Sequence, residues 1–275
     1  MKFSSYILFL FLVLLSVQNV DARKRPTSKF DNKRESSIDF PLIEPDPVVR
    51  KSRPDSQPRA LVKPTLRGGS DSKLVGNSVV GIDVSHYQGT IDWKEVARDP
   101  QVKFVFLKMT EGTNFIDNTY SYNLREARKA GLKVGVYHFF RANVSSQAQF
   151  ENFKNYYDIR QQDLLPIIDV ELNNGVGTEL FISRLKEFLD LVSKHIGRRP
   201  IIYTGKHYYQ KYMYSPYFRS YPLMIASYTT NPPELFDGRE YIIWQFTSKG
   251  RIRGIRGDCD RSCFMGRHNL REIQF

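Results

Sequence analysis

From residue 79 onward, short apolar runs alternate along the chain with longer amphipathic stretches. The apolar runs cover residues 79–84, 103–109, 133–139, 164–170, 200–204, 222–227, 241–246 and, more weakly, 253–259. Short runs of this kind, rich in β-branched and aromatic side chains, predict buried strands. We therefore expect eight strands, of which the last has the weakest signal.

The amphipathic stretches between the first strands predict helices at residues 92–98, 119–130, 145–157 and 178–196. The last of these is the clearest, because Thr178 is a candidate cap, an apolar stripe follows it, and Gly197 ends it. The stripe consists of Leu180, Phe181, Leu185, Phe188, Leu189, Val192 and Ile196. The later connections between strands are too short for full helices.

Alternating helices and continuously apolar strands are typical of a parallel sheet covered by helices. Eight strands within roughly 200 residues favour a sheet that closes on itself. We predict an α/β fold, a compact (β/α)8-like (TIM-type) barrel with helices missing in its second half. An open doubly wound sheet is the alternative.

The first 76 residues differ from the rest of the chain. Lys2 and an apolar core at residues 6–17 precede a plausible cleavage site after Ala22, which predicts a signal peptide at residues 1–22. The core is shorter than the roughly 20 residues of a membrane span, so an uncleaved anchor is the alternative. We expect a secreted protein, extracellular or periplasmic, that does not stay inserted in the membrane after cleavage.

Residues 23–76 are rich in proline and charge and show no helical or strand periodicity. Such a segment cannot bury enough apolar surface to offset its ordering entropy, so we interpret it as a disordered linker. A pro-segment that covers the functional site is the alternative. The folded part is then a single domain at residues 77–275, and we expect it to be a monomer.

The formal net charge of +12 predicts attraction to anionic surfaces. For an exported protein, an anionic cell-wall surface fits this charge better than nucleic acid, for which the sequence contains no recognisable module. The two cysteines, Cys259 and Cys263, predict a local disulfide. A zinc site would need two more ligands, and His268 alone is not sufficient, so we expect neither metal nor cofactor.

The hydrophobic run at residues 164–170 ends in two acids, Asp169 and Glu171. In a strand, residues i and i+2 project from the same face, so these carboxylates would lie close together. Carboxylates held close cannot ionise independently, and one tends to keep its proton. A proton donor beside an anion is what cleavage of a glycosidic bond requires. A strand that ends in two solvated acids is the alternative.

In a barrel, the site is built at the carboxyl ends of the strands. Acids and aromatics recur at these ends: Asp83, Glu111, Tyr137, Phe139, Asp169, Glu171, Tyr203, Tyr228, Trp244, Gln245 and Asp260. Singly, each could be a core residue or a solvated loop residue. Together they predict an acidic cleft walled by aromatic rings, which is how proteins hold sugars.

These residues also carry a family resemblance. The segment G-I-D-V-S-H-Y-Q-G at residues 81–89 resembles the first strand of glycoside hydrolase family 25, the Chalaropsis-type lysozymes. F-L-K-M-T-E-G at 106–112 and G-V-Y-H-F at 135–139 are similar to later motifs of that family. The Asp169-x-Glu171 pair, Trp244-Gln245 and Asp260 follow in order, so the resemblance covers residues 79 to about 265.

The resemblance implies a muramidase that cuts the β-1,4 bond from N-acetylmuramic acid to N-acetylglucosamine in bacterial peptidoglycan. It implies that Glu171 is the general acid and that Asp169 orients the 2-acetamido group or stabilises the developing positive charge. Asp83 and Asp260 would line the same acidic site, and Glu111 would have a structural or a catalytic role. The implied substrate-binding residues are Tyr137, Phe139, Tyr203, Tyr228, Trp244 and Gln245.

Some alternatives remain open from the sequence. A catalytically inactive peptidoglycan-binding module is one, although all five carboxylates are present. A chitinase-like enzyme is disfavoured, because the longer acidic ladder of that class is missing before Asp169. Met224 departs from the family pattern, since a bulky aromatic is expected there. Retaining and inverting outcomes both remain open, and we favour a substrate-assisted retaining path in keeping with the resemblance.

Overall fold

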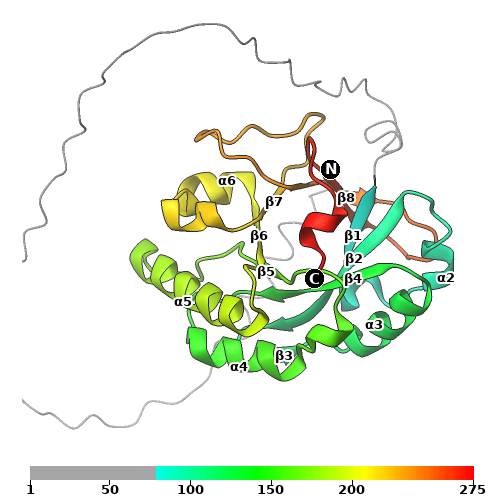
Figure 1. Ribbon diagram of the computed structural model, residues 1–275, viewed down its shortest axis with the longest axis horizontal. Coiled ribbons are helices and arrows are strands. Elements are labelled where there is room, and N and C mark those ends of the chain that lie inside the picture. Colours follow the sequence, from blue (N-terminus) through cyan, green and yellow to red (C-terminus); the bar gives the residue numbers. More distant parts are fainter. Residues whose placement is uncertain (1–78) are drawn as a thin grey trace, which may run out of the picture. The chain divides into compact units, whose positions relative to one another are not determined.

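The computed structural model describes residues 79–275, so the expectations for residues 1–22 and 23–76 lie outside the described part. Within it, eight strands form a closed barrel and a short additional strand pairs at its rim (Figure 1). The strands are β1 (Val80–Val84), β2 (Val102–Glu111), β3 (Phe115–Ile116), β4 (Lys133–Phe139), β5 (Ile167–Asp169), β6 (Ile201–Gly205), β7 (Leu223–Ala226), β8 (Ile243–Gly250) and β9 (Cys259–Phe264).

Around the barrel the strands follow the order β1-β9-β8-β7-β6-β5-β4-β2, and the pairing of β2 with β1 closes the ring. All pairs from β1 through β2, β4, β5, β6 and β7 to β8 are parallel. Strand β9 is antiparallel to both of its neighbours. The predicted barrel is confirmed, with a final strand that runs in the opposite direction.

The helices are α2 (Trp93–Val96), α3 (Tyr120–Lys129), α4 (Ser146–Tyr156), α5 (Thr178–Ile196) and α6 (Lys206–Tyr208). The long ones, α3, α4 and α5, lie outside the half of the barrel formed by β2, β4 and β5 (Figure 1). After α5 the described chain contains only short helical turns, including Tyr209–Met213, Pro216–Ser220 and Leu270–Ile273. The prediction that the second half lacks helices is therefore confirmed.

Helix α5 agrees with its predicted bounds but begins differently. Gly177 is the N-cap, and Thr178 is already the first helical residue without a capping side-chain hydrogen bond. Leu180 is 44% exposed, whereas the other residues of the apolar stripe are buried. At the far end, Gly197 adopts φ 72°, the left-handed conformation that ends helices and favours glycine.

The last predicted strand was misplaced. Residues 253–258 belong to the loop of the β8–β9 hairpin, where Gly254 and Gly257 adopt φ 86° and 89°. The strand itself starts at Cys259 and contains Asp260 and Ser262 among its six residues. Polar residues at alternate positions of this strand hide it from a search for apolar runs.

Two phenylalanines of β2 fill the interior and make glycine necessary on both neighbouring strands. A Cβ atom at Gly81 of β1 would lie 2.0 Å from the Phe104 ring, and one at Gly135 of β4 would lie 2.6 Å from the Phe106 ring. Phe104 and Phe106 are fully buried and meet edge to face, with ring centroids 5.9 Å apart. The aromatic rings of β2 thus fill the space that side chains at positions 81 and 135 would otherwise occupy.

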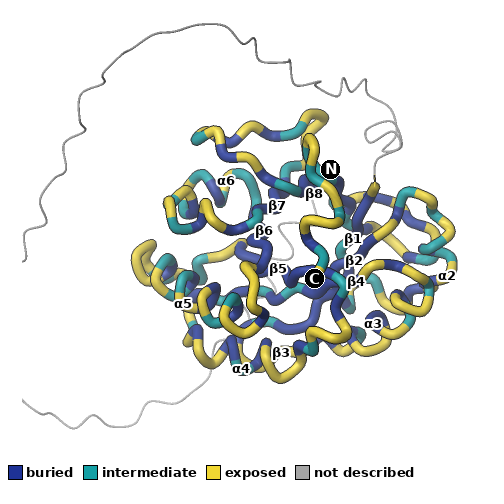
Figure 2. The backbone as a smooth tube through the Cα atoms, in the orientation of Figure 1, coloured by how far each residue is buried: buried dark blue, intermediate teal, exposed yellow. Residues whose placement is uncertain are grey.

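Burial follows the arrangement of strands on the inside and helices on the outside (Figure 2). The strands are largely buried, whereas the outward surfaces of α3, α4 and α5 are exposed. In residues 79–275, no helix has both the length and the apolar character needed to cross a membrane.

Both cysteines are free and buried in β9, so the prediction of a local disulfide is wrong. Cys259 and Cys263 lie four positions apart in one extended strand, which separates their Cα atoms by roughly 13 Å. A disulfide requires Cα atoms about 4.4–6.8 Å apart. Burial raises the pKa of Cys263 to about 12, which keeps this thiol protonated.

Candidate active site

Hydrogen bonds between strands that are not neighbours identify the side chains that point into the barrel. Gln245 of β8 donates through Nε2 to Asp83 Oδ2 of β1 at 3.1 Å, although β9 lies between these strands. Tyr203 of β6 donates to Gln245 Oε1 at 2.9 Å across β7. These bonds must cross the interior, so Asp83, Tyr203 and Gln245 meet inside the barrel near the carboxyl ends of the parallel strands.

Gln245 joins several predicted site residues. Its carbonyl oxygen accepts hydrogen bonds from the Tyr203 and Tyr228 hydroxyls, both at 2.9 Å, while its amide nitrogen donates to Asp83. The side chain is 2% exposed. A primary amide can donate and accept at once, which a carboxylate cannot do, so the residue type fits this position.

Asp83 and Asp260 lie directly opposite each other in the antiparallel β1–β9 pair. Burial raises the pKa of Asp83 to about 6, and the hydrogen bonds from Gln245 and Ser262 partly offset this. Burial, then the charges of Asp83 and Glu171, raise the pKa of Asp260 to about 7. The sequence placed both residues in one acidic site, and the structure brings them together.

Asp169 ends β5 and is 8% exposed, whereas Glu171 lies two residues farther on and is exposed to solvent. Burial and the neighbouring charge of Glu171 raise the pKa of Asp169 well above its ordinary value. The surrounding protein atoms also remove part of the hydration of Glu171 and raise its pKa, an effect that Tyr203 partly offsets. The two carboxylates influence each other, as their spacing predicts.

One oxygen of Asp169 has no protein partner. Its Oδ1 is buried and accepts no hydrogen bond from the described residues. A buried carboxylate oxygen without a donor is costly, because it has lost its hydration without replacement. The arrangement is suited to a ligand that brings its own donor.

Glu111 belongs to an ion-pair network. Lys108 Nζ lies 2.6 Å from Glu111 Oε2, and Arg141 Nε donates to Glu111 Oε1 at 2.9 Å. Burial alone would raise the pKa of Glu111, but the bonds to Lys108 and Arg141 lower it below the ordinary value. Glu111 is thus held ionised and fully occupied with cations, which favours the structural role over proton transfer.

Lys108 is a site residue that the sequence analysis missed. It is 8% exposed, and its ammonium lies 5.1 Å from the Phe115 ring centroid and 5.3 Å from that of Phe139. Its charge lowers the pKa of both Asp169 and Glu171. The available signal was a lysine inside an otherwise apolar strand, because lysine is rarely buried without a partner.

His86 and Asp117 form a second pair, whose contact the sequence did not predict. Asp117 Oδ2 lies 2.7 Å from His86 Nδ1 and also accepts from the His86 backbone N–H at 3.0 Å. The His86 ring lies 5.8 Å from the Phe115 ring, which in turn contacts Lys108. This pair connects the segment after β1 to the residue that follows β3.

The predicted aromatics fall into two groups. Tyr137 and Tyr203 are enclosed near the carboxylates, and burial followed by the charge of Asp169 or Glu171 raises the pKa of each hydroxyl well above its usual value. Phe139 and Tyr228 form the second group. The Arg141 guanidinium lies 4.6 Å from the Phe139 ring centroid, and Tyr228 is 51% exposed.

Trp244 differs from these residues. Its ring is 3% exposed, and its Nε1 donates to the Ser227 carbonyl at 2.8 Å. Because it precedes the inward-pointing Gln245 in β8, it faces the other side of the strand. Its place among the substrate contacts stays a prediction, and little ring surface is open. Met224 is fully buried.

Within residues 79–275, no group of three histidine, cysteine or acidic side chains is arranged to hold a metal ion. Pockets of about 620 Å³ and 1180 Å³ lie elsewhere on the surface, and the carboxylates at positions 83, 111, 169, 171 and 260 line neither. The candidate active site is identified by its side chains.

Comparisons with known proteins agree with this arrangement. The family model described as Glycosyl hydrolases family 25 matches residues 82–255. The protein YegX of Escherichia coli K12 is 35% identical over 201 residues, which cover 72% of each chain. Lysozyme M1 of Streptomyces globisporus is 31% identical over 218 residues, covering 73% of this chain and 74% of the relative.

Solved structures show the same fold. A bacterial lysozyme from Streptomyces coelicolor superposes with a TM-score of 0.63 at 30% identity, covering 69% of this chain and 93% of its own. A family 25 glycosyl hydrolase from Bacillus anthracis gives 0.64 at 30% identity, covering 76% and 95%. The chain belongs to glycosyl hydrolases family 25 and is a glycoside hydrolase of the lysozyme type.

Proposed function

We propose that this lysozyme hydrolyses the β-1,4 bond between N-acetylmuramic acid and N-acetylglucosamine in bacterial peptidoglycan. The observation that carries the proposal is the Asp169–Glu171 pair, in which one carboxylate is buried with an unpartnered oxygen and the other is exposed. Both pKa values are raised, so the pair retains a proton at higher pH than separate carboxyls would.

In this proposal Glu171 is the general acid. Its exposure at the end of β5 lets a glycosidic oxygen approach, and its raised pKa favours the protonated form that can donate. When the bond between C1 and the leaving oxygen breaks, the Glu171 proton passes to that oxygen. The carboxylate that results then takes a proton from the water that completes hydrolysis.

Asp169 would act on the 2-acetamido group of the sugar. The acetamido N–H supplies the donor that Asp169 Oδ1 lacks, and this bond turns the acetamido oxygen toward C1. Attack by that oxygen forms a cyclic intermediate, and attack by water reopens it with retention of configuration. The separation of the two carboxyl groups then matters less than in a direct displacement.

The other acids would support this pair. Asp83 and Asp260 would line the floor of the site, where their raised pKa values limit the negative charge close to Asp169. Glu111 would hold Lys108 and Arg141 in place. The sugar contacts would come from Tyr137, Phe139, Tyr203, Tyr228, Trp244 and Gln245.

We further propose that residues 1–22 direct secretion and that residues 23–76 link this segment to the catalytic part. The net charge of +12 would then draw the exported enzyme to the anionic bacterial wall. A secreted monomer that acts on peptidoglycan needs no cofactor for the chemistry proposed here.

Mass analysis of soluble fragments released from purified peptidoglycan tests the proposal directly. Fragments that carry N-acetylmuramic acid at their new reducing end are the expected products. Fragments with N-acetylglucosamine at that end would overturn the bond assignment. Binding to the wall without any released fragments would favour the inactive binding module instead.

A further inference from the structure

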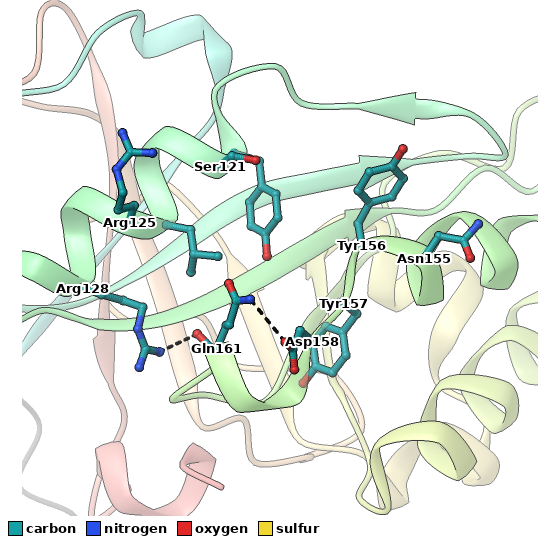
Figure 3. A pocket seen from close by; sticks show the side chains of 10 residues that line it. Ser121, Arg125, Arg128, Asn155, Tyr156, Tyr157, Asp158 and Gln161 are labelled. Carbon is teal, nitrogen blue, oxygen red and sulfur yellow. Dashed lines mark hydrogen bonds between the residues drawn. The ribbon is translucent and has the colours of Figure 1, made fainter.

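A second concave site lies on the helical side of the barrel, away from the carboxylates. A pocket of about 620 Å³ lies between α3, the end of α4 and the turn at Ile159–Gln161 (Figure 3). Its lining consists of Tyr120, Ser121, Leu124, Arg125, Arg128, Asn155, Tyr156, Tyr157, Asp158 and Gln161. Its volume lies within the roughly 300–1,000 Å³ of small-molecule sites.

The pocket combines aromatic surface with amide and hydroxyl groups. Tyr156 is 42% exposed, whereas Tyr120 and Tyr157, which also belong to the lining, are buried. Asn155 and Tyr156, at the end of α4, and Ser121 of α3 contribute to different sides of the pocket lining (Figure 3). Exposed aromatic rings beside amides are suited to sugars, whose C–H faces pack on rings while their hydroxyls form hydrogen bonds.

The charges at the pocket favour an anion. Arg125 and Arg128 project from the α3 wall, with side chains 65% and 39% exposed. Asp158 is the acid in the lining, and its carboxylate is paired with Arg160, 2.9 Å away. An acidic group entering the pocket would meet two guanidinium groups, each of which also pairs with an acid outside the lining, Glu126 or Asp163.

The two arginines differ in the hydrogen bonds that their guanidinium groups already form. Arg128 donates to the Gln161 carbonyl and to Asp163 Oδ2, which holds the pocket wall together. Arg125 donates through its Nε to Glu126 Oε1, and its guanidinium lies 5.8 Å from the Tyr122 ring centroid. Its two terminal nitrogens are thus the donors best placed to bind an anionic group from solution.

Two polar atoms buried beside the pocket lack a hydrogen-bond partner among the described residues. The Tyr157 hydroxyl is buried without a hydrogen-bond partner in residues 79–275, and so is Oε1 of the neighbouring Gln162. Gln162 Nε2 is meanwhile bonded to the Tyr120 hydroxyl at 3.3 Å. Buried polar atoms of this kind ordinarily find a partner, so both are exceptions to the usual pattern.

We propose that this pocket is a second, non-catalytic carbohydrate-binding site that accepts a hexose with an anionic substituent, the ring on Tyr156 and the anion on Arg125. It rests on the proposed function only in that a bacterial wall supplies such sugars. The anionic group of such a sugar is either the free lactyl carboxylate of muramic acid or the phosphate of a sugar-phosphate polymer of the wall. Holding the wall here would keep the enzyme on an insoluble substrate between cleavage events.

Titration of the isotope-labelled mature chain, observed by NMR, tests the site. The probes are N-acetylmuramic acid, N-acetylglucosamine 6-phosphate and neutral N-acetylglucosamine. We expect backbone amides of residues 121–128 and 155–161 to shift with the two anionic sugars. Whichever of the two binds more tightly identifies the anionic group. Absence of shifts in these amides would overturn the proposal.

Two variants separate the contributions. Arg125→Gln should weaken both anionic sugars about tenfold, equivalent to about 1.4 kcal/mol, without affecting the neutral sugar. Tyr156→Ala should weaken all three. Arg253→Gln and Tyr214→Ala, exposed residues outside the pocket, are the matched controls. Equal weakening of neutral and anionic sugars by Arg125→Gln would contradict anion recognition.

Activity measurements keep this inference distinct from the proposed function. Turnover of a short soluble glycan should be the same for Tyr156→Ala and the unaltered chain, while release of fragments from insoluble wall should fall. If no glycan is cleaved at all but the pocket still binds anionic sugars, the proposed function fails and the pocket assignment stands.

Discussion

Asp83 and Asp260 lie directly opposite each other in neighbouring antiparallel strands, and both have pKa values raised toward neutrality, to about 6 and about 7. Side chains at opposed positions share one face of a sheet, so two ionised carboxylates there would repel each other. The barrel keeps these two acids close together at the candidate site, although repulsion between them lowers the stability of the folded state. The cost should appear in the pH dependence of unfolding.

Asp260→Asn should stabilise the protein at pH 8 but not at pH 4. A carboxyl whose pKa is about 7 in the folded state and about 4 when unfolded contributes stability below pH 4, which is lost as the pH rises through 7. The asparagine variant lacks this loss, so its advantage at pH 8 should exceed about 1 kcal/mol. Thermal unfolding across this range measures it, and an equal difference at both pH values would contradict the assignment.

Glu171→Gln should abolish lysis of bacterial walls while leaving the fold intact. The amide has nearly the same shape but cannot donate a proton to the leaving oxygen, a transfer worth about 10²–10⁴-fold in rate. Turnover of purified peptidoglycan and thermal unfolding are the measurements. Glu187→Gln, at an exposed position on α5, is the control. Retention of more than about a tenth of the activity would remove Glu171 from the acid role.

Asp169→Asn should lower kcat by about 10²–10³-fold with little change in KM, because the lost interaction strengthens in the transition state. Fresh reducing ends should have the β-configuration, observed by proton NMR before mutarotation. An initial α-anomer from the unaltered enzyme would show that Asp169 activates water instead. That result would leave the muramidase assignment standing.

Lys108→Met should move the whole pH–activity profile to higher pH. The Lys108 charge lowers the pKa of Asp169 and Glu171, so its removal raises both, by about one unit for a nearby charge. Lys154→Met, whose lysine pairs with Glu151 on the surface of α4, should leave the profile unchanged. Reduced turnover without any shift in optimum would mean that Lys108 acts only through its ion pair with Glu111 and its contacts with Phe115 and Phe139.

A chain that begins at Asn77 should match the mature protein in thermal stability and in specific activity on soluble glycan. Residues 23–76 contribute no apolar periodicity to a core, and the family match begins at residue 82. Differential scanning calorimetry and initial rates provide the comparison. A several-fold rise in activity after truncation would instead support a pro-segment that covers the site.

The parallel strands could be predicted from the sequence because they are apolar on both faces. The same reasoning misplaced the last strand, since β9 places Asp260 and Ser262 toward the acidic interior and has no continuous apolar run. The candidate site carboxylates could be proposed from the sequence because they follow strands. Lys108 was missed because the apolar run around it suggests a core position. Its contact with Glu111, three residues along the same strand, goes with a register shift between Lys108 and Thr110 that the sequence does not reveal.

Trp244 shows that the sequence does not predict which face of a strand a side chain occupies. Aromatic character at a strand end suggests a sugar platform, but one residue decides which face of the strand a side chain occupies. Its neighbour Gln245 points inward, so the indole lies on the opposite face and is buried. Residue type alone does not reveal this register, which depends on how β8 pairs with β7 and β9.

The two free thiols of β9 have a consequence for how this protein can be made. Many small exported proteins rely on oxidation to reach a stable fold, and they misfold when produced where thiols stay reduced. Here Cys259 and Cys263 are enclosed in a barrel whose stability comes from packing, without a covalent link between them. The catalytic part should therefore fold equally well under reducing and oxidising conditions, and its production is not tied to an oxidative folding pathway.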